Sequence, residues 1–179
     1  MRKLILPVLT AVLMLNVITP AAARGRSEEG TKGAPPAVDA GTAERLEELG
    51  FVLPERLLPV PDLGFDSLKG DPVFLAGTAG SLVMLNFWAS WCPPCREEMP
   101  SMQRLWERLG EEDFLLYAVS VGERRETVES FIADEGYTFP VLLDPGGVGA
   151  AVFHVQGIPV TWLIGPGEYI LGRYTGSRE

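Results

Sequence analysis

Cys92 and Cys95 are the only cysteines in the 179-residue chain, and they stand three positions apart in the stretch NFWASWCPPCREEMP. An apolar run precedes Cys92, and a helix is predicted to begin directly after it, because Pro93 and Pro94 suit the first positions of a helix. This spacing brings both sulfurs to one face of the helix, within reach of a disulfide bond. The free N–H groups and the positive end of the helix dipole favour a thiolate at Cys92. We therefore predict an acidic, accessible Cys92 sulfur that attacks disulfides, and a Cys95 sulfur that resolves the mixed disulfide.

Two structural uses of the cysteines explain the spacing less well. A bridge that only staples the fold would gain about 2 kcal/mol for a four-residue ring, against about 3 kcal/mol for a ring of 15 residues. A structural zinc ion needs four ligands, usually cysteine and histidine, and His154 is the only histidine in the chain. No metal site is therefore predicted. A non-catalytic module that binds copper, haem or a partner protein through the cysteines stays open as an alternative.

The elements that must position the cysteines indicate an α/β domain. Continuous apolar runs at Ser81–Trp88 and Phe114–Val121 are typical of central strands that are covered on both faces. Further strands are predicted at 139–143, 160–164 and 169–174, helices at 93–109, 126–135 and 148–155, and a β-hairpin between 65 and 75. Strands that alternate with helices and end in a hairpin predict an α/β sandwich with a mixed sheet.

The first 23 residues have the order of a secretory signal peptide. Arg2 and Lys3 give a positive start, an apolar run extends from Leu4 to Ile18, and the small residues 21–23 (AAA) supply a cleavage site. The run is shorter than the roughly 20 apolar residues that a membrane span needs. Cleavage after Ala23 is therefore favoured over retention as a membrane anchor, and the protein is expected to be exported.

Residues 24–57 are predicted to form a flexible tether, because residues 24–40 are rich in glycine, proline, serine and charge. A short helix is expected within it at Thr42–Gly50, capped by Thr42 and ended by Gly50. Residues 58–179 are expected to form the folded domain. The net charge of −9 argues against nucleic-acid binding.

The motif FWASWCPPC followed by REEMP, together with GIPVTWLI further along the chain, resembles the thioredoxin superfamily. Within it, the sequence is most similar to the exported TlpA/ResA-like thiol-disulfide oxidoreductases, and the resemblance covers Leu58 to Gly176. It implies a thioredoxin-like fold that has a mixed central sheet, an N-terminal β-hairpin and an inserted helix and strand. The superfamily normally adds a helix after the terminal hairpin. That final helix is expected to be missing, because the sequence stops at Glu179.

The resemblance also implies roles for single residues. Cys92 matches the nucleophile of the family and Cys95 its resolving cysteine, so the two are expected to form the redox-active disulfide. Pro159, which follows Ile158, matches the cis-proline whose loop faces the disulfide and pairs with the substrate. Trp91, directly before the nucleophile, matches a residue that lines the substrate surface.

Glu98 is a candidate for proton transfer. Thioredoxins proper have a buried aspartate where this chain has Asn86, whereas the exported group has a glutamate three residues after the second cysteine, which Glu98 matches. A half-buried carboxyl group near the sulfurs would have a raised pKa and could exchange a proton with Cys95. The alternative is that Glu98 faces solvent beside Arg96 and Glu97.

The family implies that the protein reduces disulfides in client proteins, for example in cytochrome c maturation, in the periplasm or another extracytoplasmic space. A membrane thiol carrier would supply the electrons, and no cofactor is expected beyond the disulfide Cys92–Cys95. A disulfide oxidase or isomerase on the same fold stays an alternative, because the sequence does not give a reduction potential.

Overall fold

The computed structural model describes residues 38–110 and 113–178. The strands within them are β1 Leu58–Pro59, β2 Gly64–Ser67, β3 Val73–Phe74, β4 Leu82–Trp88, β5 Phe114–Val121, β6 Val141–Asp144, β7 Val160–Ile164 and β8 Tyr169–Thr175. The helices are α1 Ala40–Glu48, α2 Pro93–Leu109, α3 Arg125–Glu135 and α4 Val148–Val152.

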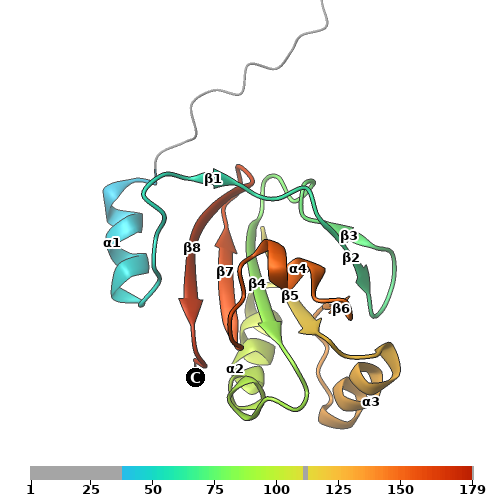
Figure 1. Ribbon diagram of the computed structural model, residues 1–179. Helices are drawn as coiled ribbons and strands as arrows, with labels where there is room; N and C mark the ends of the chain where they lie inside the picture. Colours follow the sequence, from blue (N-terminus) through green and yellow to red (C-terminus); the bar gives the residue numbers. More distant parts are fainter. Residues whose placement is uncertain (1–37, 111–112, 179) are drawn as a thin grey trace, which may run out of the picture. The chain divides into compact units, whose positions relative to one another are not determined.

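Within the described residues, eight strands form one sheet in the order β1-β8-β7-β4-β5-β6-β2-β3 (Figure 1). Strand β4 pairs in parallel with β5, and β5 with β6, whereas all the other neighbours are antiparallel. The mixed sheet is therefore confirmed, and so are the β2–β3 and β7–β8 hairpins. The carboxyl end of β4 leads directly into α2, so the strand places the Cys-x-x-Cys segment at one end of the sheet.

Helices cover both faces of the sheet, and neighbouring residues of β4 contact opposite layers. Phe87 packs in a cluster with Phe153, which directly follows α4. Trp88, the next residue, packs in a second cluster with Met99 of α2 and Val128 of α3. Both aromatic side chains of β4 are fully buried. This two-sided burial explains why β4 is an almost unbroken apolar run.

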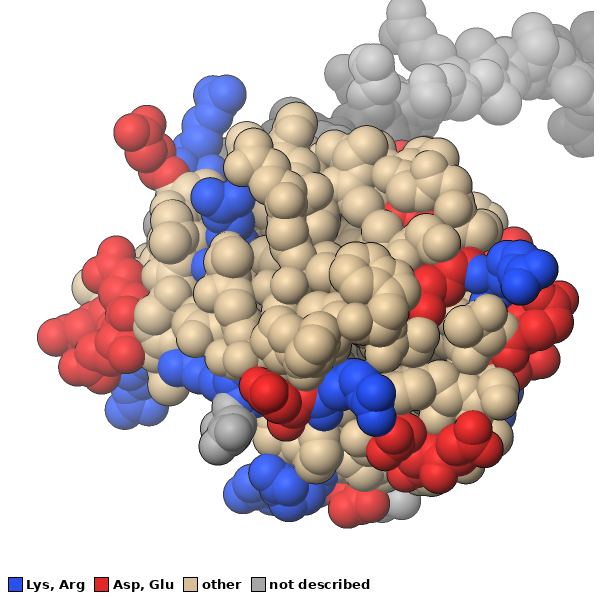
Figure 2. All heavy atoms as spheres, turned by 60° about the horizontal axis from the view of Figure 1, so that its bottom comes forward, with Lys and Arg blue, Asp and Glu red and all other residues tan. Residues whose placement is uncertain are grey.

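Charged side chains border the end of the sheet at which β4 leads into α2. Figure 2 turns this end toward the viewer and shows a broad uncharged area, with acidic and basic side chains around it. The exposed Trp91 side chain belongs to the loop at this end.

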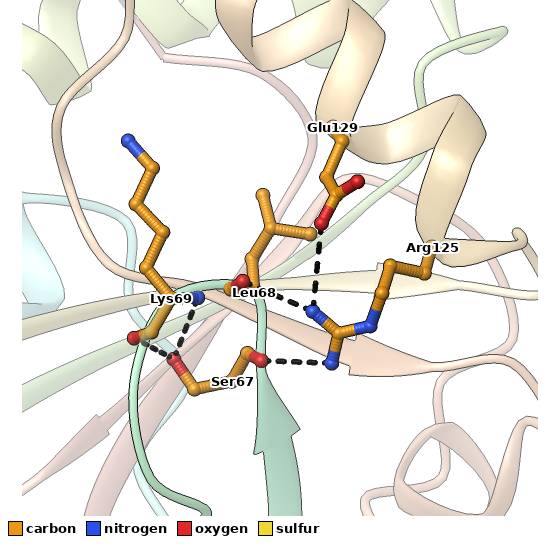
Figure 3. Close-up of polar contacts among 5 residues, drawn as sticks. All are labelled: Ser67, Leu68, Lys69, Arg125 and Glu129. Carbon is orange, nitrogen blue, oxygen red and sulfur yellow. Dashed lines mark hydrogen bonds and ion pairs between the residues drawn. The ribbon is translucent and has the colours of Figure 1, made fainter.

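Arg125, the first residue of α3, ties this helix to the end of β2. Its guanidinium donates hydrogen bonds to the carbonyl oxygens of Ser67, at 2.9 Å, and Leu68, at 3.0 Å (Figure 3). It also lies 3.7 Å from the carboxylate of Glu129, one helical turn later. The β2–β3 hairpin is therefore joined to the rest of the fold by these side-chain contacts as well as by the pairing of β2 with β6.

The helix in the predicted tether begins two residues earlier than expected, and its predicted cap was wrong. Asp39, not Thr42, is the N-cap, because its carboxylate accepts from both the backbone N–H of Thr42, at 2.9 Å, and the Thr42 hydroxyl, at 2.6 Å. A carboxylate can accept both bonds at once, so it outcompetes the hydroxyl as a cap. After the helix, Val52 and Arg173 of β8 exchange two backbone hydrogen bonds.

Two predicted elements have different bounds. Strand β6 begins at Val141 rather than at 139, because Pro140 has no N–H to donate to a ladder. Helix α4 ends at Val152 rather than at 155, since His154 has a φ of 50° in the left-handed region. Neither change moves the cysteines.

None of the residues described after β8, 176–178, is helical, and the absence of the final helix stays a prediction. The predicted signal peptide and residues 24–37 of the predicted tether lie outside the described residues. Among the helices that the structure describes, none has the length and apolar character needed to cross a membrane.

Candidate active site

Cys92 and Cys95 lie where β4 leads into α2, and the structure joins them in a disulfide. Cys92 is the N-cap residue of α2, and its Sγ accepts the backbone N–H of Cys95 at 3.3 Å. Pro93 and Pro94 occupy the first two helical positions, as the sequence predicts, where no intrahelical partner for an N–H exists. The Cys92 sulfur therefore lies at the positive end of a 17-residue helix.

The accessible sulfur predicted at position 92 was wrong for this disulfide form, because Cys92 is only 2% exposed. Its neighbours are more open: Trp91 is 69% exposed and Pro93 is also exposed. The disulfide thus lies directly beneath the surface, next to a large exposed aromatic ring. Cys95 is fully buried.

The Ile158–Pro159 peptide bond is cis, and this loop lies against the disulfide. The Cys92 Sγ is 3.7 Å from the carbonyl oxygen of Ile158. Pro159 is buried, whereas Ile158 is half-buried. The structure therefore places the proline loop beside Cys92, although the two are 66 residues apart in the sequence. Trp91 directly precedes Cys92, and the substrate surface itself stays a prediction.

Glu98 is buried beneath this surface, so the alternative that it faces solvent is wrong. Its side chain is 3% exposed. Its Oε1 accepts from the Asn86 side chain at 2.8 Å, and its Oε2 accepts from the backbone N–H of Arg178 at 3.2 Å. Burial raises the pKa of Glu98 to about 7, while the two hydrogen bonds act in the opposite direction. A carboxyl group with this pKa can gain or lose a proton near neutral pH.

Asn86 links three elements around Glu98. Its Nδ2 group on β4 donates both to Glu98 on α2 and, at 3.1 Å, to the hydroxyl of Thr161 on β7. Asn86 and Thr161 are direct partners in the antiparallel β4–β7 ladder. The role of Thr161 was not predicted. Asn86 and Thr161 are each a polar residue within an apolar strand, and two such residues paired across neighbouring strands indicate a buried polar site.

Glu123, in the turn between β5 and α3, is a further buried carboxylate that sequence reasoning missed. It is 7% exposed. It accepts the backbone N–H of Ser90 at 2.9 Å, the Ser90 hydroxyl, and the hydroxyl of Ser120 at 2.8 Å. Ser90 stands two residues before Cys92, so Glu123 fixes the loop that leads to Cys92. The signal in the sequence is an acidic residue two positions after the end of a buried strand.

A disulfide at the N-terminus of a helix, facing a cis-proline loop on a mixed sheet, is the arrangement that defines a thioredoxin-like protein.

No three His, Cys, Asp or Glu side chains among residues 38–110 and 113–178 lie close enough together to hold a metal ion. The expectation that no cofactor is needed stays a prediction.

Comparison with known proteins assigns the family. The model of the AhpC/TSA family matches residues 58–172, and the chain belongs to this family. The chain is 35% identical over 117 residues to the thiol-disulfide oxidoreductase ResA of Geobacillus kaustophilus, and this match covers 65% of this chain and 67% of that protein. It is 32% identical over 117 residues to ResA of Bacillus subtilis, where the match covers 65% of each. The matched region thus spans about two thirds of each curated relative.

Solved structures agree with this assignment. A protein from Chlorobium tepidum that is described as a thiol:disulfide interchange protein DsbE superposes with a TM-score of 0.63 at 32% identity, over 67% of this chain and 84% of that one. StoA from Bacillus subtilis superposes with a TM-score of 0.59 at 26% identity, over 67% and 92%. The predicted thioredoxin-like fold and the resemblance to ResA-like proteins are confirmed. The protein is a thioredoxin-like thiol-disulfide oxidoreductase.

Proposed function

We propose that the protein reduces disulfides of client proteins outside the cytoplasm, by cycling Cys92 and Cys95 between dithiol and disulfide. The observation that carries this proposal is the position of the Cys92 sulfur, which accepts an N–H at the N-terminus of α2 and lies 3.7 Å from the carbonyl of Ile158. The first feature stabilises a thiolate. The second places the sulfur beside a loop whose backbone can pair with an extended client segment.

The first step forms a mixed disulfide. The thiolate of reduced Cys92 attacks one sulfur of the client disulfide, a bond forms between the two sulfurs, and the client disulfide breaks. The released client sulfur leaves as a thiolate and takes a proton from solvent. Because Cys92 is 2% exposed in the disulfide form, we expect a client to reach this sulfur through the surface that Trp91 and Ile158 share.

The second step releases the client. Cys95 loses its proton and attacks the Cys92 sulfur, the mixed disulfide breaks, and the client leaves as a dithiol with the two electrons of the cysteine pair. Cys95 is fully buried, so its proton needs an acceptor inside the protein. Glu98 is the buried carboxylate one helical turn away on the same face of α2. We assign to it the role of accepting this proton and returning it when the disulfide is reduced again.

Three parts of the proposal depend on the family and on the predicted signal peptide. The reducing direction follows from the resemblance to the ResA-like group, whose clients include proteins of cytochrome c maturation. Export follows from residues 1–23. The reduced form would be restored by a membrane thiol carrier, as the resemblance to the exported group implies.

A trapping experiment tests the function. The Cys95→Ser variant cannot resolve a mixed disulfide, so clients should remain bound to Cys92 and be released by dithiothreitol. The matched control is Cys92→Ser, which should retain none. Equal recovery from both variants would contradict a client-reducing role.

The reduction potential decides the direction. A value near the roughly −270 mV of thioredoxin supports reduction of clients, whereas a value near the roughly −120 mV of DsbA supports the oxidase alternative.

Copper titration addresses the binding-module alternative. Stoichiometric copper binding that is lost in Cys92→Ser, without reduction of insulin disulfides, would favour that alternative.

A further inference from the structure

The residues that directly follow β8 lie across the buried Glu98 carboxyl group. The backbone N–H of Arg178 donates to Glu98 Oε2 at 3.2 Å. Its carbonyl oxygen accepts from the Ser101 hydroxyl at 3.0 Å. The same hydroxyl proton is shared with the carbonyl oxygen of Glu98, at 2.7 Å, one turn earlier in α2. The main chain of Arg178 is therefore bonded on both sides to the turn of α2 that carries Glu98.

The Arg178 side chain is held by two aromatic rings from other elements. Its guanidinium carbon lies 4.7 Å from the ring centre of Tyr174 on β8 and 5.9 Å from that of Phe51, which follows α1. The two rings are 5.8 Å apart and pack against each other. Cation–π contacts of this kind contribute about 0.5–1 kcal/mol each at exposed sites. They hold the segment in place independently of its contacts with Glu98.

A cavity of about 340 Å³ that opens to solvent lies on the α2 face of the sheet at this point. Glu98, Ser101, Thr161, Tyr174 and Arg178 line it, so residue 178 forms part of the wall of the same cavity that Glu98 lines. The other charged side chains that face the cavity are Arg104 and Arg108 of α2, while β4 and β7 contribute the uncharged Met84 and Thr161. Among the described residues, the segment after β8 contacts the carboxyl group on this side through the N–H of Arg178.

We infer that Arg178 is a positioning residue for Glu98: seated on Tyr174 and Phe51, it holds the segment after β8 across the carboxyl group and keeps water away from it. The disulfide itself is not contacted by this segment. Arg178 would therefore act on the proton transfer of the proposed function and not on the sulfur chemistry. The expected effect of Arg178 on catalysis rests on the proposed function, in which Glu98 transfers a proton. The expected effect of Arg178 on the pKa of Glu98 does not.

The direction of the effect follows from the contributions to the Glu98 pKa. Burial is the largest and raises the pKa, whereas the hydrogen bond from the Arg178 N–H is the smallest and lowers it. If the segment moves away, water enters and donates to Oε2 in place of the lost N–H, while the burial decreases. The net result is a pKa that falls from about 7 toward the ordinary 4.5.

The experiment is a carbon-13 NMR titration of the Glu98 carboxyl group in the full-length disulfide form. Arg178→Ala removes the guanidinium that contacts the two aromatic rings. We expect the Glu98 titration midpoint to fall by about one pH unit or more. Ser101→Ala removes the bond to the Arg178 carbonyl and should lower the midpoint in the same direction, by less. The matched control is Arg173→Ala, which removes a similar contact, 6.0 Å from the ring centre of Trp162, on the α4 face of the same sheet.

An unchanged or higher midpoint in Arg178→Ala overturns the inference, and so does an equal fall in Arg173→Ala. The proposed function fails separately. If the midpoint falls as expected but the pH dependence of client reduction does not follow it, the cover by Arg178 stands and the catalytic role of Glu98 is wrong.

Discussion

Ser90 donates both its backbone N–H and its hydroxyl to the carboxylate of Glu123, 33 residues later in the chain. The pair connects the end of β4 with the end of β5, which is its parallel neighbour in the sheet. The loop between β4 and α2 makes a tight turn here, with the N–H of Cys92 bonded to the carbonyl of Ala89 at 3.1 Å. The position of the nucleophile therefore depends on a side chain from outside the Cys-x-x-Cys motif.

Replacement of Glu123 by Gln should destabilise the protein and loosen the loop. A glutamine keeps one acceptor oxygen but turns an NH₂ group toward donors, so at least one buried donor loses its partner. The expected loss in the free energy of unfolding is about 1–3 kcal/mol. Urea denaturation measures it, and Glu126→Gln, a substitution at an exposed position in the first turn of α3, is the matched control. Equal unfolding midpoints for the two variants would contradict the role assigned to Glu123.

The elements that carry the cysteines were predictable because their signals are local. The apolar runs of β4 and β5 reflect burial on both faces, and the two prolines mark the start of α2. The burial of Glu98 was not predictable in this way, since Arg96 and Glu97 beside it are exposed. One of the groups that enclose it, Arg178, is 80 residues away in the sequence. Polar partners brought together by the fold leave no periodic pattern in a single chain.

The same limit explains the errors at element ends. Asp39 and Thr42 both belong to the residue types that cap helices, and only the geometry shows that one accepts from the other. The accessibility of Cys92 was likewise inferred from its place at a helix start. In the structure the proline loop covers it, and that loop is 66 residues away.

Replacement of Trp91 by Ala should weaken the binding of protein clients without affecting the chemistry of the sulfurs. The side chain is 69% exposed and adjoins the nucleophile, so its ring is available to a client but contributes little to the core. We expect KM for insulin reduction to rise several-fold while the reduction of a small disulfide keeps its rate. The free energy of unfolding should change by less than about 0.5 kcal/mol.

Val148→Ala is the control for Trp91→Ala, because Val148 on α4 has similar exposure at 60% but does not adjoin the cysteines. It should leave both substrates unaffected. A Trp91→Ala variant that reduces insulin with the wild-type KM would show that this ring does not contact clients.

Glu98→Gln should remove a pH-dependent step from catalysis. In the proposed mechanism only the ionised carboxylate can accept the Cys95 proton, so the resolution rate of the wild type rises as the pH passes through about 7. The variant cannot ionise, and its rate should be lower and should lack this inflection. Stopped-flow measurement of mixed-disulfide resolution over the pH range gives both profiles. Superimposable profiles would rule out proton transfer through Glu98.

The same carboxyl group makes the folded state bind protons more tightly than the unfolded chain does, which gives a stability test that is independent of catalysis. The pKa of Glu98 is about 7 in the fold against an ordinary value of 4.5. Its contribution to stability is therefore fully present below about pH 4.5 and is lost as the pH rises through about 7. At about 1.4 kcal/mol for each pH unit, the loss is on the order of 3 kcal/mol.

We therefore expect the free energy of unfolding of the wild type to fall, relative to that of Glu98→Gln, between about pH 5 and pH 8. Urea denaturation of both disulfide-bonded proteins across this range measures the difference, and all groups other than Glu98 cancel in the comparison because both proteins carry them. Asn86 donates to Oε1 in the wild type and can donate to the amide oxygen of the variant, whereas the Arg178 N–H loses its acceptor at Oε2. The variant itself does not titrate at this position, so this loss lowers its stability without adding a pH dependence. Two stability curves that stay parallel across this range would mean that Glu98 titrates near its ordinary value. The raised pKa assigned to the buried Glu98 carboxyl group would then be wrong.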